Sequence, residues 1–455
     1  MVPLPAQGHL NQLLQLCCLV SSYGHPVHYI GSAIHNQQAR VRANGLDPNK
    51  LAKIHFHDLP TPDFDCPSPD PTASIKFPAH LQATWEAAQL LGHPTAHVLR
   101  ELASNASRVV IIHDPMMSMV VQDAKLIPNA ESYAFNCISV FSLLSFRYGG
   151  LGKQVPILGD QIAMEMPSGV DGCMTESFAV FVEAQKEYLK LRGGDIHNSN
   201  RLIEGPFIDI LEKDGYVENM KEWFIAPILP ANHQGIIISS NHHNHPCLAW
   251  LDQQPQNSVL FVSFGTMTSM SDEEVRELAM GLELSKHRFL WVLRDADKGN
   301  IFSGKSRRII ELPEGFEERV KGVGLVVRDW APQPEILSHR ATGGFMSHCG
   351  WNSCMESITL GVPMAAWPMH SDQPMNSFLV AKILKTGLIV REWAKRGEVV
   401  KSWAIENVVR RLMGSEEGDE IRKRAQELGE TIRKSAQEGG VSRMELDSFI
   451  AHITR

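Results

Sequence analysis

The sequence predicts an α/β protein built from two doubly wound domains with parallel sheets. Short apolar runs alternate with amphipathic helical patterns along most of the chain, which is typical of βαβ units. A polar, turn-rich stretch around residues 230–246 interrupts this alternation about halfway and indicates a linker. The 455 residues suffice for two domains of ordinary size, which we place at 1–232 and 247–436, joined by residues 233–246.

In the first half, the spacing of apolar residues predicts a helix over Gly8–Tyr23 and a second, amphipathic helix over Phe178–Leu191. Strands are expected at Pro26–Ile30, Lys53–Phe56 and Arg108–Ile112. The last of these runs is apolar after its first residue, as expected of a strand buried on both faces of a sheet. Residues Val2–Pro5 form only a short stub of a first strand.

In the second half, Ser271 and Glu274 have the spacing of a capping box, which predicts a helix that runs from there to about Lys286. Apolar runs predict further strands at Ser258–Phe264, Phe289–Leu293, Gly324–Val327, Gly344–Ser347 and Met364–Trp367. Two helices are expected near the end of the chain, over Asp419–Ser435 and Met444–Ile453.

Composition excludes several classes of protein. The 43% hydrophobic and 21% charged residues are ordinary for a globular protein and exclude a collagen-like or disordered chain. The 43 basic and 51 acidic residues give a net charge of −8, whereas proteins that grip nucleic acid by its phosphates are normally basic. No apolar run is long enough to span a membrane, and no basic side chain precedes Arg40 as a secretory signal would require. We expect a cytoplasmic protein whose eight scattered cysteines are free thiols.

The common nucleotide and hydrolase motifs are absent. Gly152-Lys153 lacks the other residues of a phosphate loop. Gly322 and Gly324 lack the third glycine of a dinucleotide-binding motif and precede a strand instead of following one. No glycine-flanked serine marks the nucleophile of an α/β-hydrolase.

The 20 histidines raise the question of a metal site. His242, His243, His245 and Cys247 match no zinc-binding spacing, so a solvated loop is favoured over a metal site. Asp295 and Asp297 have the Asp-x-Asp spacing that holds magnesium beside a nucleotide, but such pairs also cap the turns at strand ends. We expect no metal ion.

Two strand ends of the first half place a histidine and an aspartate at the same edge of the sheet, where doubly wound folds bind ligands. His9 lies in the first turn of its helix, where the partial positive charge of the helix predicts a neutral imidazole that can accept a proton. Asp114 follows the strand at 108–112, and its carboxylate would fix the tautomer of His9. A helix-capping histidine and a strand-end aspartate are equally good interpretations of the spacing.

A third junction, Phe345–Glu356, has the features of an anion site. A strand ends, Gly350 permits close approach, and the free N–H groups of the next helix suit a diphosphate. His348, Asn352 and Ser353 would add donors. Ser353 and Glu356 also have capping-box spacing, which is a structural alternative that can coexist with ligand binding.

Two segments flank this junction. Trp330 follows a predicted strand and would suit a nucleobase, although a core tryptophan is the alternative. Asp372 and Gln373 follow another strand and offer an acceptor and an amide for sugar hydroxyls.

The segment from Trp330 to Gln373 resembles the 44-residue signature box of plant UDP-sugar-dependent glycosyltransferases of family 1. It contains the runs WAPQ and HCGWNS, and the later Glu356, Asp372 and Gln373, with the spacing and length of that family. The resemblance extends along the whole chain. Segments such as PLPAQGHLNQ, WVLRDADKGNIF and WNSCMESITLGVP are most similar to zeatin O-glycosyltransferases, the cytokinin-conjugating branch.

The resemblance implies the GT-B architecture, in which two facing Rossmann-like domains enclose the active site in the cleft between them. The N-terminal domain would shape the acceptor pocket, and the C-terminal domain would hold the UDP-sugar. Residues 437–455 would form a helix that packs back on the N-terminal domain. Relatives carry a longer first strand than the stub seen here, so the placement of His9 is expected to depend on that stub.

The resemblance also implies roles for individual residues. His9 would be the general base, with Asp114 as its partner. Trp330 would stack on uracil and Ala331 would contact it through the backbone. The remaining donor contacts would be Gln333 and Glu356 to the ribose, Gly265, Thr266, His348, Asn352 and Ser353 to the phosphates, and Trp351, Asp372 and Gln373 to the sugar.

We therefore expect a UDP-glucose-dependent, inverting O-glycosyltransferase that needs no metal and acts as a monomer. Its acceptor would be a small apolar plant compound such as zeatin, with a flavonoid, phenolic or terpenoid acceptor, or UDP-xylose as donor, as alternatives. A non-catalytic protein that binds a UDP-sugar or a hormone is the alternative from another functional class. The expected partners are a small acceptor and a UDP-sugar, with no nucleic acid and no membrane span.

Overall fold

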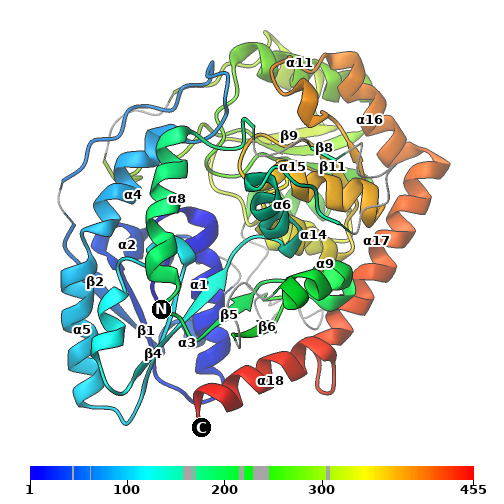
Figure 1. Cartoon of the computed structure of the whole chain (residues 1–455). Helices are drawn as coiled ribbons and strands as arrows, with labels where there is room; N and C mark the ends of the chain where they lie inside the picture. The colour runs from blue at the N-terminus through cyan, green and yellow to red at the C-terminus, as the bar shows by residue number, and fades with distance from the viewer. Residues whose placement is uncertain are drawn as a thin grey trace.

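The computed structural model describes residues 1–43, 46–61, 63–156, 166–167, 171–214, 220–228, 245–303 and 308–455. These residues form two α/β halves with parallel sheets (Figure 1), which confirms the predicted fold class. In Figure 1 the blue and cyan elements of the first half lie at the lower left, and the yellow and orange elements of the second half lie at the upper right. Among the described residues, no helix is both long and apolar enough to cross a membrane.

The first half contains two groups of parallel strands that the first two residues of the chain connect, Met1 to Ile30 in one group and Val2 to the other. One group is β1 (Val27–Ser32) with β2 (Ile54–Leu59), and the other is β3 (Val109–His113), β4 (Ala130–Asn136), β5 (Gly194–His197) and β6 (Lys221–Phe224), in that order. Val2 donates its N–H to the carbonyl of Ile112 at 2.9 Å and accepts from the N–H of Asp114 at 3.0 Å. The expected stub strand is therefore the single bridge of Val2 with His113, so the segments that lead to His9 and to Asp114 leave the sheet side by side.

Helices surround this sheet. They are α1 (Gln7–Ser21), α2 (Ala33–Val41), α3 (Pro48–Leu51), α4 (Gln82–Gln89), α5 (Gly92–Ser104), α6 (Val140–Gly150), α8 (Glu176–Leu189) and α9 (Arg201–Asp214), with short turns η1 (Ala79–Leu81), η2 (Pro115–Met117) and η3 (Gln122–Leu126). The helices predicted at Gly8–Tyr23 and Phe178–Leu191 correspond to α1 and α8 within two residues at each end. The apolar face of α1 packs under β1 and β4 through residues such as Leu13 and Cys17.

The second half contains a six-stranded parallel sheet in the order β12-β11-β10-β7-β8-β9. Its strands are β7 (Val259–Ser263), β8 (Arg288–Val292), β9 (Gly324–Val327), β10 (Thr342–Ser347), β11 (Met364–Ala366) and β12 (Gly387–Ile389). The chain reverses its direction of winding between β7 and β10, which lie side by side. Doubly wound sheets bind ligands at such a switch point, beyond the carboxyl ends of the strands.

The helices of the second half are α10 (Pro246–Leu251), α11 (Asp272–Ser285), α12 (Phe316–Arg319), α13 (Gln333–Ser338), α14 (Trp351–Leu360), α15 (Gln373–Phe378), α16 (Ser402–Gly414), α17 (Glu416–Ser435) and α18 (Val441–Ile453), with short η6 (Leu379–Ile383) and η7 (Trp393–Lys395). The capping box of Ser271 and Glu274 is confirmed, with both of its hydrogen bonds present. The second capping box is wrong, because α14 begins at Trp351 after Gly350 and Ser353 lies inside the helix.

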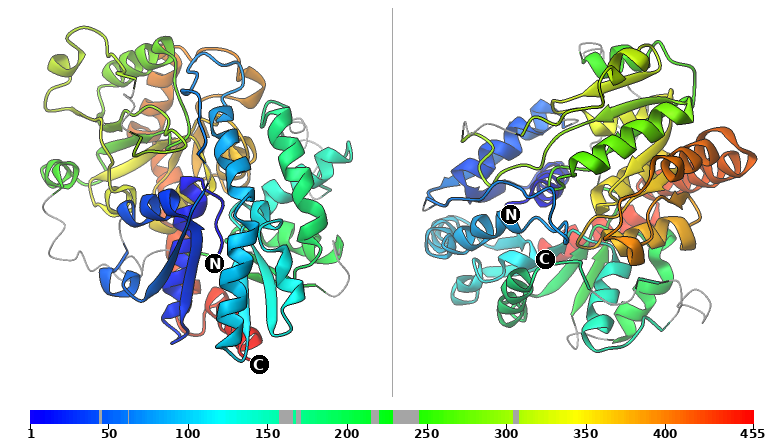
Figure 2. Two further views of the ribbon diagram at one scale, coloured as in Figure 1. Left: turned by 90° about the vertical axis from the view of Figure 1, so that its left-hand side faces the viewer. Right: turned by 90° about the horizontal axis from the view of Figure 1, so that it is seen from above.

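Apolar contacts join the two halves. A core cluster combines Phe141 and Phe207 of the first half with Phe345 and Phe378 of the second. The last helix, α18, packs against β6, with the rings of Trp223 and Phe449 5.1 Å apart. Figure 2 shows α18, in red, beside the strands of the first half.

Two sequence-based assignments depend on the region around residue 240. The linker at 233–246 lies almost entirely outside the described residues, as do His242 and His243. His245 is described, and its ring accepts a hydrogen bond from the N–H of Cys247 at the start of α10. All eight cysteines are free, as predicted.

Candidate active site

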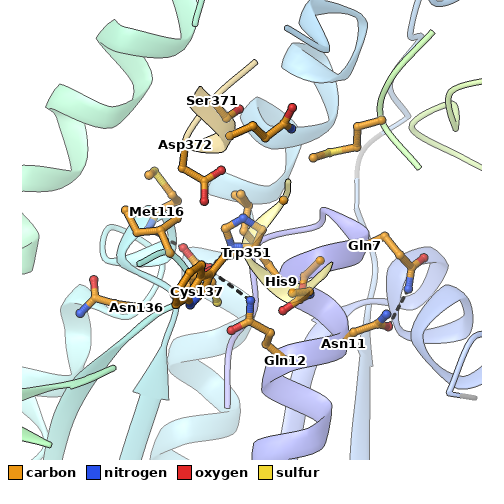
Figure 3. A pocket seen from close by; sticks show the side chains of 18 of the residues that line it. Gln7, His9, Asn11, Gln12, Met116, Asn136, Cys137, Trp351, Ser371 and Asp372 are labelled. Atoms are coloured by element: carbon orange, nitrogen blue, oxygen red, sulfur yellow. Dashed lines mark hydrogen bonds and ion pairs between the residues drawn. The ribbon is translucent and has the colours of Figure 1, made fainter. Parts of the chain in front are cut away.

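A cavity of about 980 Å³ lies between the two halves and is lined by residues of both. Every residue of the predicted catalytic pair and donor site lines this cavity: His9, Asp114, Gly265, Thr266, Trp330, Ala331, Gln333, His348, Trp351, Asn352, Ser353, Glu356, Asp372 and Gln373. Figure 3 shows side chains of both halves converging, with Asp372 extending from the second half toward His9 of the first. The winding of the two sheets therefore brings together residues that are hundreds of positions apart.

His9 and Asp114 form a close pair. Nδ1 of His9 lies 2.5 Å from Oδ2 of Asp114, whose side chain is 1% exposed. The other carboxylate oxygen accepts the N–H of Met116 at 2.9 Å, which caps the turn η2 and holds the carboxylate in place. With its Nδ1 proton donated to Asp114, neutral His9 has Nε2 as a hydrogen-bond acceptor.

The direction of the His9 pKa differs from the sequence-based expectation. Removal of the ring from water lowers this pKa most, but the charge of Asp114, the hydrogen bond to Asp114 and the charge of Asp372 together outweigh it. The pKa of His9 is therefore raised above its ordinary value. The expected lowering by the helix N-terminus is wrong in direction, because a full carboxylate charge in contact outweighs a partial helix charge.

Cys137 completes a group with His9 and Asp114 whose candidate ligand atoms lie within 4.8 Å of one another. Its Sγ lies 3.8 Å from Oδ2 of Asp114. Burial raises the pKa of the Cys137 thiol well above its ordinary value, so the thiol stays protonated. A protonated thiol is a poor metal ligand, and the short contact between His9 and Asp114 is that of a hydrogen-bonded pair.

Gly265 and Gly350, which follow β7 and β10 at the switch point, make room for His348. A Cβ on Gly265 or on Gly350 would lie 2.6 Å from Nε2 of His348, so a side chain at either position would displace the imidazole. Gly265 also has a φ of +73°, which favours glycine. Burial lowers the pKa of His348 to about 4, which keeps the ring neutral, and Nδ1 has no protein partner.

The start of α14 contacts the first half directly. The amide of Asn352 donates to the carbonyl of Gly8 at 2.8 Å, and the indole N–H of Trp351 donates to the carbonyl of Asn198 at 2.7 Å. These bonds hold the free N–H groups of α14 close to the start of α1. Trp351 is therefore committed to the contact between the halves, which sequence reasoning did not anticipate.

Gln333, Ser353 and Glu356 form one hydrogen-bonded group. The amide of Gln333 donates to Oγ of Ser353 at 3.0 Å and to Oε2 of Glu356 at 2.8 Å. Burial raises the pKa of Glu356 to about 7, against the lowering effect of the Gln333 hydrogen bond. The group can thus present a carboxyl that accepts or donates hydrogen bonds near neutral pH.

Trp330 lies under two arginines that the sequence analysis missed. The guanidinium of Arg42 is 4.5 Å from the ring centroid, and that of Arg294 is 5.5 Å away. Oδ1 of Asp297 accepts from both arginines, at 2.9 and 3.0 Å. Asp297 is thus a buried partner for two cations, and Asp295 accepts from Ser269, so this Asp-x-Asp pair does not have the free carboxylates of a metal site.

Asp372 and Gln373 stand at the start of α15. Oδ2 of Asp372 accepts from Asn376 at 2.8 Å, and burial raises the pKa of Asp372 to about 6, against the lowering effects of that bond and of His9. The carbonyl oxygen of Gln373 accepts from the N–H groups of Met369 and His370. The NH₂ of Gln373 also lies 3.3 Å from both ring nitrogens of His370, so it has one N–H left for a ligand.

The rest of the cavity wall is largely apolar. Phe77 and, from helix α6 and its end, Leu143, Phe146 and Leu151 contribute to it. Helix α8 contributes a further wall through residues such as Phe178 and Val182, which sequence reasoning recognised as helical but not as part of a site. Their apolar spacing alone could not distinguish a cavity wall from a packed core.

Two family models match the chain. A "Glycosyltransferase, N-terminal domain" model matches residues 1–230, and a "UDP-glucoronosyl and UDP-glucosyl transferase" model matches residues 218–410. Together they cover most of both halves.

Curated relatives are similar over the full chain. A zeatin O-glucosyltransferase of Phaseolus lunatus is 49% identical over 100% of this chain and 96% of its own length. A zeatin O-xylosyltransferase of Phaseolus vulgaris is also 49% identical, over 100% of this chain and 97% of its own length. A cis-zeatin O-glucosyltransferase of Zea mays is 42% identical over 100% of this chain and 97% of its own length.

Solved structures agree over the whole fold. Phytolacca americana UGT2, complexed with UDP-2fluoro-glucose and pterostilbene, matches with a TM-score of 0.75 at 28% identity, covering 100% of this chain and 99% of its own. A transferase of Siraitia grosvenorii in complex with UDP matches with a TM-score of 0.77 at 28% identity, with the same coverage. These matches confirm the GT-B fold. The chain belongs to the plant family 1 UDP-glycosyltransferases.

Proposed function

We propose that this glycosyltransferase uses UDP-glucose, inverts the anomeric centre, and acts on the hydroxyl of a small apolar acceptor, with zeatin as the first candidate. The observation that carries the proposal is the His9–Asp114 pair, 2.5 Å apart, in the same cavity as the signature-box residues. A base and a donor site that face one cavity are what direct transfer from a nucleotide sugar to a hydroxyl requires.

In the reaction, the acceptor hydroxyl attacks the anomeric carbon of the sugar while Nε2 of His9 takes its proton. The glycosidic bond forms as the bond between that carbon and the UDP oxygen breaks, and UDP leaves with the bonding electrons. A single displacement converts an α-linked donor into a β-glucoside. Positioned general-base catalysis contributes about 10²–10⁴-fold to such a step. The scheme needs no metal ion.

Asp114 keeps the Nδ1 proton of His9 in place and stabilises the imidazolium that forms. The raised pKa of His9 makes the ring a stronger base than an ordinary histidine. Because of this shift, activity should be lost, as the pH is lowered, at a higher pH than the ordinary histidine pKa would predict. The reason is that only the neutral ring can accept a proton.

The donor roles follow the signature box. Trp330 stacks on uracil and Ala331 contacts it through the backbone, with Arg42 and Arg294 near the Trp330 ring and both held by the same oxygen of Asp297. Gln333 and Glu356 hold the ribose. The phosphates lie against the start of α14, where N–H groups and the helix charge stabilise departing UDP. Gly265, Thr266, His348, Asn352 and Ser353 complete that site.

The sugar lies between Trp351, Asp372 and Gln373. Asp372 has one carboxylate oxygen engaged by Asn376 and can use the other for a sugar hydroxyl. The relatives support zeatin as acceptor, since their names join zeatin to transferases from two genera. The donor is less constrained, because one 49% relative is a glucosyltransferase and the other a xylosyltransferase. UDP-xylose is therefore the second candidate donor.

The test is turnover of trans-zeatin by the purified protein with UDP-glucose or UDP-xylose, with NMR of the product. We expect UDP and a β-glucoside, and a rate with UDP-xylose that is slower by about tenfold or more. A parallel panel of flavonoid, phenolic and terpenoid alcohols identifies any better acceptor. Failure of every acceptor with both donors refutes the proposal, and retained configuration refutes single displacement. The variant His9→Ala should lose transfer but still bind UDP in calorimetry.

We also keep the domain division as a proposal: an acceptor domain at 1–232, a linker at 233–246, a UDP-sugar domain at 247–436 and a returning helix in 437–455. The contact of α18 with β6 supports the last of these. A monomer is sufficient for activity, since the residues proposed for both substrates come from one chain. Sedimentation of the active protein tests this.

A further inference from the structure

Beside the catalytic pair and the proposed donor site, the cavity has a further group of polar side chains. Asn136, Asp195, His197 and Glu222, which we call the polar cluster, line the cavity together with Arg192. They come from the neighbouring parallel strands β4, β5 and β6, where Asn136 is in register with His197, and Asp195 with Glu222. Alternation along a strand places Asp195 and His197 on the same face, whereas Ile196 between them belongs to the core on the other face.

The polar cluster contains groups without partners. His197 is 1% exposed, and neither of its ring nitrogens has a hydrogen-bond partner in the protein. Oε2 of Glu222 also has none, and it lies 3.7 Å from Nε2 of His197, beyond hydrogen-bond distance. Buried polar groups are almost always paired, so three orphaned atoms at one cavity end indicate that something else completes them.

The remaining members of the cluster are held in place. Asp195 accepts from Nε of Arg192 at 2.7 Å and from Nη2 at 2.5 Å, which neutralises its charge. The ring of His197 stacks on that of Phe224, with centroids 4.8 Å apart and planes at 15°. The cluster is thus a rigid set of donors and acceptors beside an aromatic surface.

The chemistry of these groups favours a neutral ligand. Burial lowers the pKa of His197 to about 4, so its ring is neutral and offers one donor and one acceptor. Burial raises the pKa of Glu222 to about 7, so its carboxyl can donate or accept near neutral pH. A partner with both an N–H donor and a ring-nitrogen acceptor would satisfy both side chains without burying a net charge.

The polar cluster also lies at a useful distance from the proposed base. Asp114 follows β3, Asn136 ends β4, and His197 ends β5. Adjacent strands are about 4.8 Å apart, so about 10 Å separates the catalytic pair from His197. A ring with a short hydroxylated side chain spans such a distance. In Figure 3, Asn136 lies on the side of His9 away from Gln7 and Asn11.

From this arrangement we infer that the polar cluster binds a nitrogen heteroaromatic ring, of the purine or aminopyridine class, by hydrogen bonds to His197 and Glu222. The ring would then present the hydroxyl of its side chain to His9. This inference rests on the proposed function and extends it, because it assigns the selectivity for nitrogen-containing acceptors to two named side chains. It also gives a role to polar side chains of the cavity that neither the catalytic pair nor the proposed donor site uses.

The test compares two acceptors that carry an allylic hydroxyl, trans-zeatin and cinnamyl alcohol, whose ring has no nitrogen. His197→Phe keeps the size and the stacking but removes both nitrogens. It should raise KM for zeatin about 5- to 100-fold, the effect of leaving a buried partner unsatisfied. The kinetics with cinnamyl alcohol and KM for UDP-glucose should stay unchanged. Glu222→Gln, on a side chain 15% exposed, is a second and milder probe of the same site.

Ile196→Val on the opposite face of β5 is the matched control and should not change the ratio of the two acceptors. Deaza analogues of zeatin, each lacking one ring nitrogen, identify the contact, since one of them should be insensitive to His197→Phe. Equal losses with both acceptors, or an unchanged ratio, overturn the inference and indicate that the cluster holds only water.

A binding arm separates this inference from the proposed function. Calorimetry with adenine, which has no hydroxyl to glycosylate, should detect binding in the presence of UDP that His197→Phe weakens. Binding of adenine by a protein that transfers no sugar would retain the inference and refute the function. Transfer to zeatin that is indifferent to His197→Phe would do the reverse.

Discussion

Replacing Asp114 with asparagine tests the catalytic pair with minimal change in shape. In the native protein, Oδ1 of Asp114 accepts the N–H of Met116 at 2.9 Å and Oδ2 faces Nδ1 of His9 at 2.5 Å. In Asp114→Asn the amide oxygen stays with Met116, so the NH₂ faces His9. Because NH₂ can only donate, Nδ1 of His9 must become an acceptor, and its proton moves to Nε2. Nε2 can then no longer accept a proton from the substrate.

The magnitude follows from losing the base while keeping both binding sites. General-base catalysis is worth about 10²–10⁴-fold, so kcat should fall by that factor, or about 3–5 kcal/mol of transition-state stabilisation. KM for UDP-glucose should change little, because Asp114 belongs to the first half and the donor box to the second. Without the Asp114 charge, removal from water dominates and lowers the pKa of His9, so the acid limb of any residual activity moves to lower pH.

The assay is initial-rate measurement of UDP release with trans-zeatin and UDP-glucose, repeated across pH. Cys137→Ser is the matched control, because Cys137 lies 3.8 Å from the same carboxylate but is a neutral thiol. This control should retain kcat within a few-fold. If Asp114→Asn keeps kcat within about tenfold of the native value, or if its acid limb does not move, the assignment of His9 and Asp114 as a base and its partner is refuted.

Three further changes test the packing around the site. Gly350→Ala places a methyl group 2.6 Å from the His348 ring and should weaken UDP binding by about tenfold or more in calorimetry; unchanged affinity would remove His348 from the phosphate site. Arg42→Leu breaks a buried ion pair between the halves and should lower the free energy of unfolding by about 2–4 kcal/mol, whereas Arg40→Leu, in an exposed pair, should lower it by less than about 1 kcal/mol in the same urea titration. Burial raises the pKa of Glu204 to about 7, above its unfolded value, so its contribution favours the fold at low pH and is lost as pH rises toward and past 7. Between pH 5 and pH 8, the free energy of unfolding of Glu204→Gln should therefore rise by about 1–3 kcal/mol relative to that of the native protein. If the urea midpoints of the two proteins differ by the same amount at both pH values, the assignment is contradicted.

The elements that sequence reasoning found and missed differ in one physical respect. Strands β7 to β11 were predicted within one or two residues, because both faces of each are apolar and each is followed by a recognisable turn. Strands β4, β5 and β6 were missed. Their cavity faces carry Asn136, Asp195 and Glu222, and these polar residues break the apolar run that marks a buried strand. Three of the four missed strands thus line the proposed acceptor side of the cavity, and the fourth is the three-residue strand β12.

The donor side was easier to predict than the acceptor side. Trp330 to Gln373 is a continuous stretch in which the proposed donor-site residues follow strands β9, β10 and β11, so its pattern can be recognised locally. Arg42 gives no such signal. It ends a short polar helix, and only folding brings it to Asp297, 255 positions along the chain. Charged residues at helix ends are common on protein surfaces, and its sequence neighbours do not distinguish a buried ion pair from an exposed one.

Local signals in the sequence were enough to predict the two-domain α/β fold, the βα junctions and the proposed donor site, because strand, turn and helix signals depend on neighbours within a few residues. Which side chains meet became clear from the folded structure. The 2.5 Å contact of His9 with Asp114, the direction of the His9 pKa and the orphaned nitrogens of His197 all depend on burial and on charges contributed by distant segments. Desolvation and Coulomb energies depend on distances in space, and these distances exist only once the two halves have folded together.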